Sequence, residues 1–495
     1  MQSDKTGDSS DIPSIELTRP SPLTLPVVLM GVVLVAMSIS GTAVALPSIG
    51  EDLAASGSAL NWVVAGYNLA FAAMTLVAGS TADRLGRRLV FIAAATIFAA
   101  GSVIAAVSPA ILVADIARIV SGIGGAGIMA AGGAILAATY DGNARNRAFA
   151  LMGTMAGVGI ALGPSLSGAL ISLTGWRGSF LLFAAVGLIV AVGATRLSES
   201  HAEDGRTDWF GSITFIVSLS AIMFAVIEGP TIGWTDGRIL IAFAAGVILL
   251  VVFGVAQRRS SSPLLAPSLV NNRGFLGWSL ATLTTSIGFL GALVFLPSYL
   301  QAVSGLSPVQ AGVAMLLLTA PVLVMPMVAG HLVNAGFSAK VLIIAALVLV
   351  VAGNLALLTL SPDNTITVAA APLLMIGIGM GTSFGITDAQ AMSLVSPDTV
   401  GMAAGFLNTL RGAAEALVIA GFSASLLGFL GSELGDQGRA AMVSSGRLGT
   451  APGPEIEAFT WSWHMTQLVI GVLCLALSVV VTFLILWKDR SASTH

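Results

Sequence analysis

Charged residues are scarce in this chain. Only 9% of its 495 residues are Asp, Glu, Lys or Arg, whereas 56% are hydrophobic and the mean hydropathy is +0.95. A soluble domain carries about 25% charged residues. The composition therefore indicates a protein that is embedded in a lipid bilayer.

Cysteine and histidine are also scarce. The single cysteine, Cys474, lies in an apolar run, which excludes disulfides within the chain and thiolate metal sites. The four histidines include no pair at the helical spacing of metal ligands. No metal or other cofactor is expected, and the protein is not expected to be an enzyme.

The sequence also lacks a nucleotide-binding loop and a basic face. The glycine-rich run 122–127 spells a dinucleotide-binding fingerprint, but it lies inside a long apolar helix and follows no strand. ATP is therefore not expected as the energy source. No nucleic-acid partner is expected, because no surface is offered to a phosphate backbone.

Long apolar runs occupy most of the chain. A membrane-spanning helix needs about 20 predominantly apolar residues. By that criterion the sequence predicts an all-α polytopic membrane protein with fourteen transmembrane helices. They are expected near 25–47, 59–80, 89–108, 111–138, 149–172, 179–197, 209–228, 238–256, 275–297, 308–332, 340–360, 366–387, 401–429 and 464–487.

Two polar stretches, 198–208 and 257–274, divide these helices into groups of six, two and six. Internal repeats of this kind are typical of secondary transporters, which hold substrate near the midplane between two halves. The longest loop, 430–463, is rich in Gly, Ser and Pro and is expected to be an irregular tether. The predicted organisation is a polar tail (1–24), a six-helix bundle (25–197), a linker with an inserted helix pair (198–257), a second linker (258–274), a second six-helix bundle (275–488) and a short tail (489–495).

The basic residues predict the orientation. Lys and Arg remain in cytoplasmic loops, and most of them fall on the side of the two chain ends if the N-terminus is inside. Segment 1–24 is polar and lacks the basic start and apolar core of a signal peptide. Both termini are therefore expected in the cytoplasm, with the protein in the cytoplasmic membrane. The exceptions on the outer side are Arg177, Arg238, Arg439 and Arg447, while Arg118 and Arg411 fall within spans.

Segment 79–88 connects two predicted helices and combines glycines, an acid and arginines. Glycine permits close approach of backbones, and Asp83 suits the positive N-terminal end of a helix. A purely topogenic basic loop is the alternative, but it would require neither the acid nor the glycines. The residues of this candidate gating motif are Gly79, Asp83, Arg84, Gly86, Arg87 and Arg88.

On these residues the chain resembles the major facilitator superfamily, specifically its fourteen-helix drug:proton antiporter branch. Segment 79–88 matches the superfamily's loop motif, departing only at Thr81, and the resemblance extends over roughly residues 37–425. It implies the major facilitator fold, in which this loop latches the two halves on the cytoplasmic side. Further matches are Asn61–Val64 with Tyr67, Arg118 with Gly122, Gly124 and Gly125, Trp176–Arg177, Gly229–Pro230 with Gly233–Trp234, and 401–411.

The predicted helix 149–172 carries small residues four apart and a proline. Small residues permit close helix contact in lipid, and proline kinks a helix, so tight packing explains part of this pattern. The resemblance implies in addition that the motif marks exporters. Its residues are Gly159, Gly163, Pro164 and Gly168.

The first predicted helix departs from the family. Where relatives have an acid this chain has Ser38, and where they have an asparagine it has Ala43. If relatives couple protons or hold cationic drugs at that acid, the function has moved here or is absent. We hypothesise that Glu415 replaces it.

Four ionisable residues lie within predicted spans. Asp115 and Arg118 are three apart, and Arg411 and Glu415 are four apart, so each pair shares a helix face. Each such group costs around 2.5–3.5 kcal/mol at mid-bilayer and should face protein or water. Self-neutralising pairs that only permit packing are one interpretation. The other is a role in proton coupling, with Arg118 implied as the family's proton-relay arginine and Asp115 nearer the outer end.

Adaptable side chains suggest where substrate binds. Methionine suits promiscuous pockets, although most methionines at helical spacing belong to the core. The pocket candidates are Tyr67, Asn68, Met129, Met152 and Met155.

The sequence thus predicts a proton-coupled exporter of small amphipathic compounds or drugs, driven by the proton gradient, with the lipid bilayer, protons and a small-molecule substrate as its partners. No obligate protein partner is implied. A facilitator or importer of a metabolite on the same fold is one alternative, which the missing acid favours. A non-transporting membrane protein is the other.

Overall fold

The computed structural model describes residues 21–140, 142–201, 208–260, 272–362, 365–394, 400–448 and 453–486. Throughout these ranges the regular structure is helical. The helices are α1 (Thr24–Asp52), α2 (Gly57–Leu85), α3 (Arg87–Ala106), α4 (Ile111–Thr139), α5 (Gly142–Ala194), α6 (Trp209–Ile232), α7 (Gly237–Arg259), α9 (Arg273–Val303), α10 (Pro308–Ala314), α11 (Leu316–Asn334), α12 (Ala339–Ala356), α13 (Thr365–Ser393), α14 (Val400–Leu434), α15 (Gln437–Ser444) and α16 (Gly453–Leu486), with a short 3₁₀ turn η1 at Leu357–Thr359.

Twelve of these helices are long and apolar enough to cross a membrane, or thirteen if the bent α2 counts as one span. The all-helical, multi-span fold class is therefore confirmed. The number fourteen is not confirmed as such, because the two spans predicted at 149–172 and 179–197 are the two parts of the kinked element α5. Gly175, with φ of 72°, is the one non-helical residue inside α5. Counting its two parts separately would give the predicted number.

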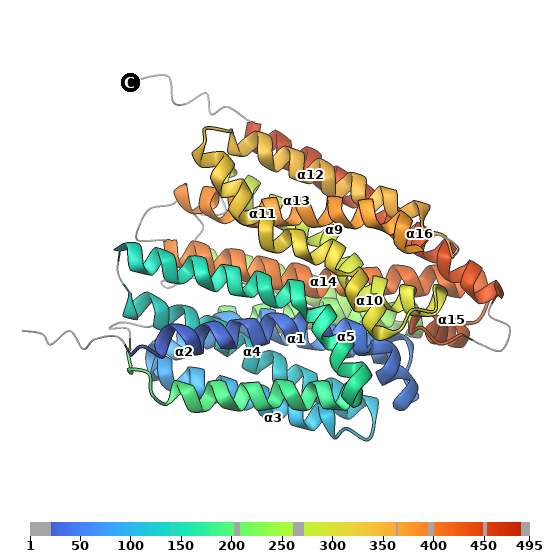
Figure 1. Ribbon diagram of the computed structural model, residues 1–495, viewed down its shortest axis with the longest axis horizontal. Helices are drawn as coiled ribbons and strands as arrows, with labels where there is room; N and C mark the ends of the chain where they lie inside the picture. Colours follow the sequence, from blue (N-terminus) through green and yellow to red (C-terminus); the bar gives the residue numbers. More distant parts are fainter. Residues whose placement is uncertain are drawn as a thin grey trace, which may run out of the picture.

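The spans form two groups that lie side by side (Figure 1). In one group α1 packs against α5, α2 against α4, and α3 against both α4 and α5. In the other, α9 packs against α13, α14 and α16, while α11 and α12 pack against α13. This arrangement follows the predicted six-helix groups, whose boundaries in the sequence stay a prediction.

The inserted pair α6 and α7 differs between its two members. Large apolar side chains of α7, including Ile241, Ile248 and Val251, are exposed, as expected for a helix that faces lipid. In contrast, α6 packs against α2 of the first group and α14 of the second, as well as against α7. The pair thus touches both halves at their lateral junction.

The ends of the bundle define two faces. We call the face with the start of α1 and the end of α16 the terminal face, and the opposite one the distal face (Figure 1). The distal face includes Asp52, at the end of α1, and Arg177, which pairs with it. Segment 79–88 lies on the terminal face. Here α2 and α3 are separated only by Gly86, as expected from so short a connection.

The prediction of an irregular tether at 430–463 is wrong for most of that range. Helix α14 continues to Leu434, α15 occupies Gln437–Ser444, and α16 starts at Gly453. Asp436 caps α15 by accepting hydrogen bonds from the backbone N–H groups of Gly438 and Arg439. Ala440 and Val443 are buried, so this segment is a packed part of the distal face.

Candidate transport site and gates

Arg118 of α4 is a fully buried cation inside the first half. Its Nη1 donates to Ser38 Oγ at 2.9 Å, its Nη2 to the Ser38 carbonyl at 3.4 Å, and its Nε to the Val63 carbonyl at 3.0 Å. The guanidinium carbon lies 4.1 Å from the centroid of the Tyr67 ring, which is a cation–π distance. All three hydrogen bonds go to uncharged oxygen atoms of the protein, so none of them forms an ion pair with Arg118.

Ser38 thus occupies the place of the acid that the resemblance leads one to expect. Its hydroxyl and carbonyl both face Arg118, and Thr42 Oγ1 donates to the same carbonyl at 2.7 Å. A carboxylate here would form an ion pair with Arg118, whereas serine only accepts a hydrogen bond. Arg118 therefore keeps its positive charge without a fixed counter-ion on α1.

Glu415 approaches this cluster from the other half. Its helix, α14, packs against α2, which carries Tyr67. Its Oε2 is buried and has no hydrogen-bond partner among the residues that the structure describes. Close packing of α14 on α2 permits this approach, because a Cβ on Gly412 would lie 2.9 Å from that of Ala72. Glu415 therefore lies on the helix of the second half that packs on the helix of Tyr67, and Tyr67 in turn lies beside Arg118.

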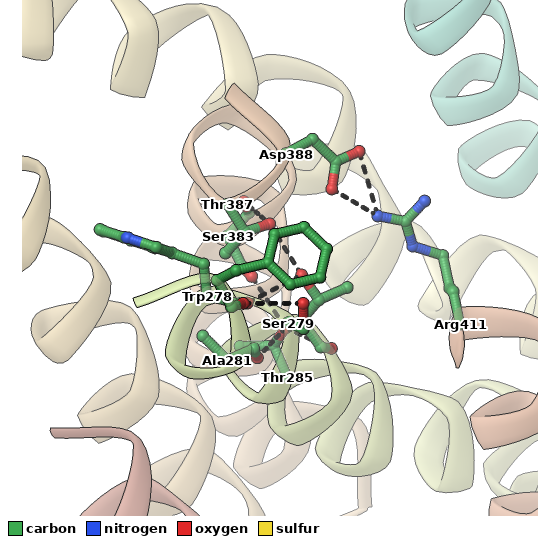
Figure 2. A network of polar contacts seen from close by, with 10 residues as sticks. Trp278, Ser279, Ala281, Thr285, Ser383, Thr387, Asp388 and Arg411 are labelled. Atoms are coloured by element: carbon green, nitrogen blue, oxygen red, sulfur yellow. Dashed lines mark hydrogen bonds and ion pairs between the residues drawn. The ribbon is translucent and has the colours of Figure 1, made fainter. Parts of the chain in front are cut away.

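The expected partnership of Arg411 with Glu415 is replaced by another one. Arg411 Nη2 donates to both carboxylate oxygens of Asp388, at 3.0 and 3.2 Å, and its guanidinium carbon lies 4.7 Å from the Phe384 ring centroid. Figure 2 shows this ion pair beside the hydroxyl groups of α9 and α13. Asp388 directly follows the span predicted at 366–387 but lies inside α13, one turn before its end.

The hydroxyl groups beside that ion pair connect α9 to α13. Thr285 Oγ1 donates to Ser383 Oγ at 2.9 Å, and Thr282 Oγ1 donates to Thr387 Oγ1 at the same distance (Figure 2). Such hydroxyl contacts stabilise helix pairs in lipid by about 0.6 kcal/mol each on average. These bonds hold α13, which carries Asp388, against α9 within the second half.

Asp115 is not paired with Arg118. The three hydrogen bonds of Arg118 go elsewhere, and Asp115 Oδ1 has no hydrogen-bond partner among the described residues. Although the residue lies near the distal end of α4, only 8% of its surface is exposed. Glu228 of α6, which sequence reasoning did not single out, accepts hydrogen bonds from Ser58 and Trp62 of α2.

The motif Gly159–Gly168 packs against α1 and against the second half. A Cβ on Gly159 would lie 2.6 Å from that of Ala36, and a Cβ on Gly163 would lie closer still to the Ser40 hydroxyl oxygen. On the side of the second half, a Cβ on Gly168 would lie 2.5 Å from the Pro308 carbonyl oxygen. The small residues therefore serve packing, as expected, and part of that packing crosses between the halves.

The contact between α5 and α10 is reciprocal. Gly168 faces Pro308, while a Cβ on Gly312 would lie 2.6 Å from the carbonyl oxygen of Pro164. Ser165 Oγ donates to the Gly312 carbonyl at 2.8 Å. The two halves are thus closed against each other in the distal part of this seam (Figure 1).

Toward the terminal face the same seam widens. Thr319 of α11 still donates to the Ala161 carbonyl at 2.7 Å. A Cβ on Gly157 would reach only the Val322 carbonyl oxygen, at 3.9 Å, and one on Gly153 would meet nothing within 4 Å. The structure is therefore closed at the distal face, and α5 and α11 separate toward the terminal face.

Further polar contacts reinforce the distal closure. Arg447 Nη1 donates to the Gly50 carbonyl at 2.8 Å, and Gln301 Nε2 donates to the Val44 carbonyl at 3.5 Å. Asn61 of α2 donates to Ser423 of α14. Each of these bonds joins the first half to the second.

The terminal-face motif is organised by a residue that the sequence analysis did not single out. Glu199 accepts hydrogen bonds from the backbone N–H groups of Arg88 and Leu89, at 2.9 and 3.1 Å. Its carboxylate therefore caps the N-terminus of α3, where negative charge is stabilised. A Cβ on Gly86 would lie 2.8 Å from that carboxylate, and its φ of 113° also favours glycine.

The other residues of the motif lie around this cap. Asp83 pairs with Arg87 at 2.9 Å one turn along, so it does not occupy the N-terminus of α3. Arg88 Nη1 donates to the Leu197 carbonyl at 3.2 Å. Arg84 is exposed, and Gly79 faces Ala130 of α4 at an ordinary distance. The motif is thus bound to the stretch that leaves α5.

The pocket candidates are divided by burial. Tyr67 and Asn68 are fully buried, and Asn68 Nδ2 donates to the Val64 carbonyl at 3.2 Å. Met129, Met152 and Met155 are partly buried against the hydrophobic core. Tyr67 belongs to the Arg118 cluster, whereas a role for the methionines in binding stays a prediction.

Many apolar spans in two packed groups, with ionisable side chains buried within each group, are typical of a membrane transporter. A sequence profile of the Major Facilitator Superfamily matches residues 28–419. The chain belongs to this superfamily.

Relatives and solved structures agree with that assignment. The chain is 29% identical over 422 residues to the multidrug resistance protein Stp of Mycobacterium tuberculosis (strain CDC 1551 / Oshkosh), covering 84% of this chain and 78% of the relative. It is 30% identical over 421 residues to the puromycin resistance protein pur8 of Streptomyces alboniger, covering 84% and 83%. Its fold is similar to that of a bacterial homologue of the lysosomal transporter Spinster, with a TM-score of 0.65 at 17% identity over 94% of this chain and 98% of that one.

Proposed function

We propose that this protein is a proton-coupled exporter of small amphipathic compounds, working by alternating access between its two halves. The terminal face is then the cytoplasmic one, as the distribution of basic residues predicts. In the conformation described above, the distal seam is closed and substrate enters from the cytoplasmic side.

The observation that carries this proposal is the packing of α14, which bears Glu415, on α2, which bears Tyr67 beside Arg118. Arg118 is a cation without a fixed carboxylate, and Glu415, in the opposite half, has a buried carboxylate oxygen without a hydrogen-bond partner among the described residues. Because Glu415 belongs to the half that must move, its surroundings change with each transition. A proton taken up from outside and released inside would give the energy, since one charge crossing 100 mV is worth about 2.3 kcal/mol.

Relatives support the substrate class. Relatives of this chain are named for resistance to puromycin and methylenomycin A, or for resistance to and export of tetracenomycin C. These compounds differ in structure, which favours a site that recognises amphipathic character rather than one molecule. We propose puromycin and the cationic dye ethidium as first probes.

Direction and driving force are tested together in proteoliposomes that contain the purified full-length chain. With the lumen made acidic relative to the outside, the proposal predicts that ethidium or puromycin accumulates in the lumen. A protonophore should abolish that accumulation. Equilibration without accumulation would instead identify a facilitator, the alternative that the missing acid on α1 favours.

A further inference from the structure

The inserted helices α6 and α7 form one unit. Ser218 Oγ of α6 donates to the Gly246 carbonyl of α7 at 2.7 Å, and near the terminal face Gln257 Nε2 donates to Asp208 Oδ2, also at 2.7 Å. A Cβ on Gly246 would lie 2.6 Å from Ile222 Cγ1, so the two helices are in close contact there. Movement of one helix therefore carries the other with it.

This unit lies at a junction of the two halves, because α6 packs against α2 of the first half and against α14 of the second. Under the proposed function the halves move relative to each other. Helix α6 can then stay in register with only one of them, and its polar contacts indicate which one.

Glu228, near the distal end of α6, joins that helix to α2. Trp62 Nε1 donates to its Oε1 at 2.9 Å, and Ser58 Oγ donates to its Oε2 at 3.1 Å. Trp62 and Ser58 are four residues apart, so both donors lie on one face of α2. Hydrogen bonds to a carboxylate are stronger than those between neutral groups. The first half thus holds α6 by two strong bonds.

The segment after Glu228 fixes the end of α6. Gly229–Pro230 with Gly233–Trp234 is one of the matches to the family, and its packing is visible here. A Cβ on Gly229 would lie 2.6 Å from the Trp234 ring, and Gly233 has a φ of 108°, which favours glycine. The indole therefore covers the residue that follows Glu228, and this motif holds the backbone from which Glu228 reaches α2.

The second half is bound to the same end of α2 in a different way. Asn61 Nδ2 donates to Ser423 Oγ of α14. Although α6 and α14 pack together, the described residues of these two helices form no hydrogen bond with each other. Opening of the distal face would break the bond of Asn61 but leave both bonds of Glu228 intact.

We propose that Glu228 is a positioning residue that fixes the inserted pair to the first half. During transport α14 then slides past an α6 that stays on α2, and the junction of α2 with α14 remains covered on its lipid side. The inference rests on the proposed function for the movement of the halves. The attachment of α6 to α2 is testable without it.

Distances between spin labels show with which half the pair moves. Full-length protein in lipid nanodiscs, with Cys474→Ala as background, carries one label at Val251 of α7 and a second at Ile97 of α3 or at Val479 of α16, all of which are exposed. Gly168→Ala, which introduces a methyl group into the distal seam, shifts the halves. We expect the α7–α3 distance to stay constant in this variant and the α7–α16 distance to change.

Substitutions of Glu228 test the attachment itself. Glu228→Leu removes both acceptors, whereas Glu228→Gln keeps an oxygen for Trp62 and an amide that donates to Ser58. Each bond to a charged group is worth about tenfold or more in an equilibrium constant. The leucine variant should therefore broaden the α7–α3 distances, and the glutamine variant should restore them. Asp236→Asn is the matched control, because Asp236 binds Arg238 within the inserted pair.

Transport measurements separate positioning from folding. Glu228→Leu should bind ethidium as the wild type does but export it more slowly, and Glu228→Gln should recover the rate. A changing α7–α3 distance in Gly168→Ala, unchanged α7–α3 distances in Glu228→Leu, or equal loss of binding and export would each overturn the proposal. If ethidium is not exported and the halves never shift, the proposed function fails, while the label distances in Glu228→Leu still decide the attachment.

Discussion

The guanidinium of Arg118 donates to the Ser38 hydroxyl at 2.9 Å, so a neutral side chain stands where the resemblance implies an acid. Arg118 thus has a hydrogen bond where an acid would give it an ion pair. This single contact separates the chain from the family pattern more clearly than any other.

The Ser38 contact is tested by Ser38→Ala and Ser38→Asp. Ser38→Ala removes the hydroxyl acceptor and leaves a buried N–H group of Arg118 without its partner. This is expected to destabilise the protein by about 1–3 kcal/mol. Aspartate is expected to form an ion pair with Arg118 and to retain the fold. Thermal unfolding in detergent measures both effects, and equal stability of Ser38→Ala and wild type would contradict the geometry.

The seam between α5 and the second half offers a matched pair of glycine substitutions. Gly168→Ala places a methyl group against the Pro308 carbonyl, at 2.5 Å before relaxation, and overpacking of this kind costs about 1–3 kcal/mol. Gly153→Ala, with no atom within 4 Å of the new methyl group, is expected to be neutral or slightly stabilising. Distances between spin labels on the distal ends of α5 and α10 should lengthen only in Gly168→Ala.

A bulky residue at Gly153 tests whether the halves alternate. In the described conformation Gly153→Trp has room, so thermal stability should be close to that of wild type. If the terminal face closes during transport, α11 must approach α5, and the indole would obstruct it. Normal export by a stable Gly153→Trp variant would argue against alternating closure along this seam.

The cap on α3 predicts an effect of Glu199. Glu199→Gln keeps the shape of the side chain but removes the charge that faces two backbone N–H groups, at an expected cost of about 0.3–1 kcal/mol. Glu433→Gln, at an exposed acid of α14, is the control. Hydrogen exchange at the amides of Arg88 and Leu89 should accelerate only in the first variant.

Closure of the distal face should depend on Arg447. Its bond to the Gly50 carbonyl links the segment after α15 to the end of α1. Arg447→Ala is expected to cost the closed conformation about 1.5–3 kcal/mol, the range for a hydrogen bond from a charged group. Labelling of a cysteine placed near Gly50 should become faster, whereas Arg238→Ala, whose arginine binds Asp236 instead, should leave it unchanged.

The sequence predicts the spans well because their signal is local. Apolar length alone identifies them, and a short polar segment such as 79–88 requires an antiparallel reversal. The failure at 430–463 has a physical reason. Its short helix α15 is held by contacts distant in the chain, such as Gly57 against Ala441, and its composition of Gly, Ser and Pro conceals them.

The polar partners are the least predictable feature. Pairs three or four residues apart suggest Asp115 with Arg118 and Arg411 with Glu415, yet each arginine binds a residue of another helix. Such contacts depend on how spans distant in the sequence pack together. The spacing of residues along one helix gives no information about that packing. Glu228 and Glu199 could have been singled out from the sequence, since each is an acid next to or inside an apolar span.

The account depends most directly on proton movement through Glu415. In proteoliposomes with a pH-sensitive dye in the lumen, addition of ethidium should drive proton flux by the wild type and by the control variant Glu433→Gln. Glu415→Gln should bind ethidium but lose that flux. Undiminished ethidium-driven proton flux in Glu415→Gln would contradict the account.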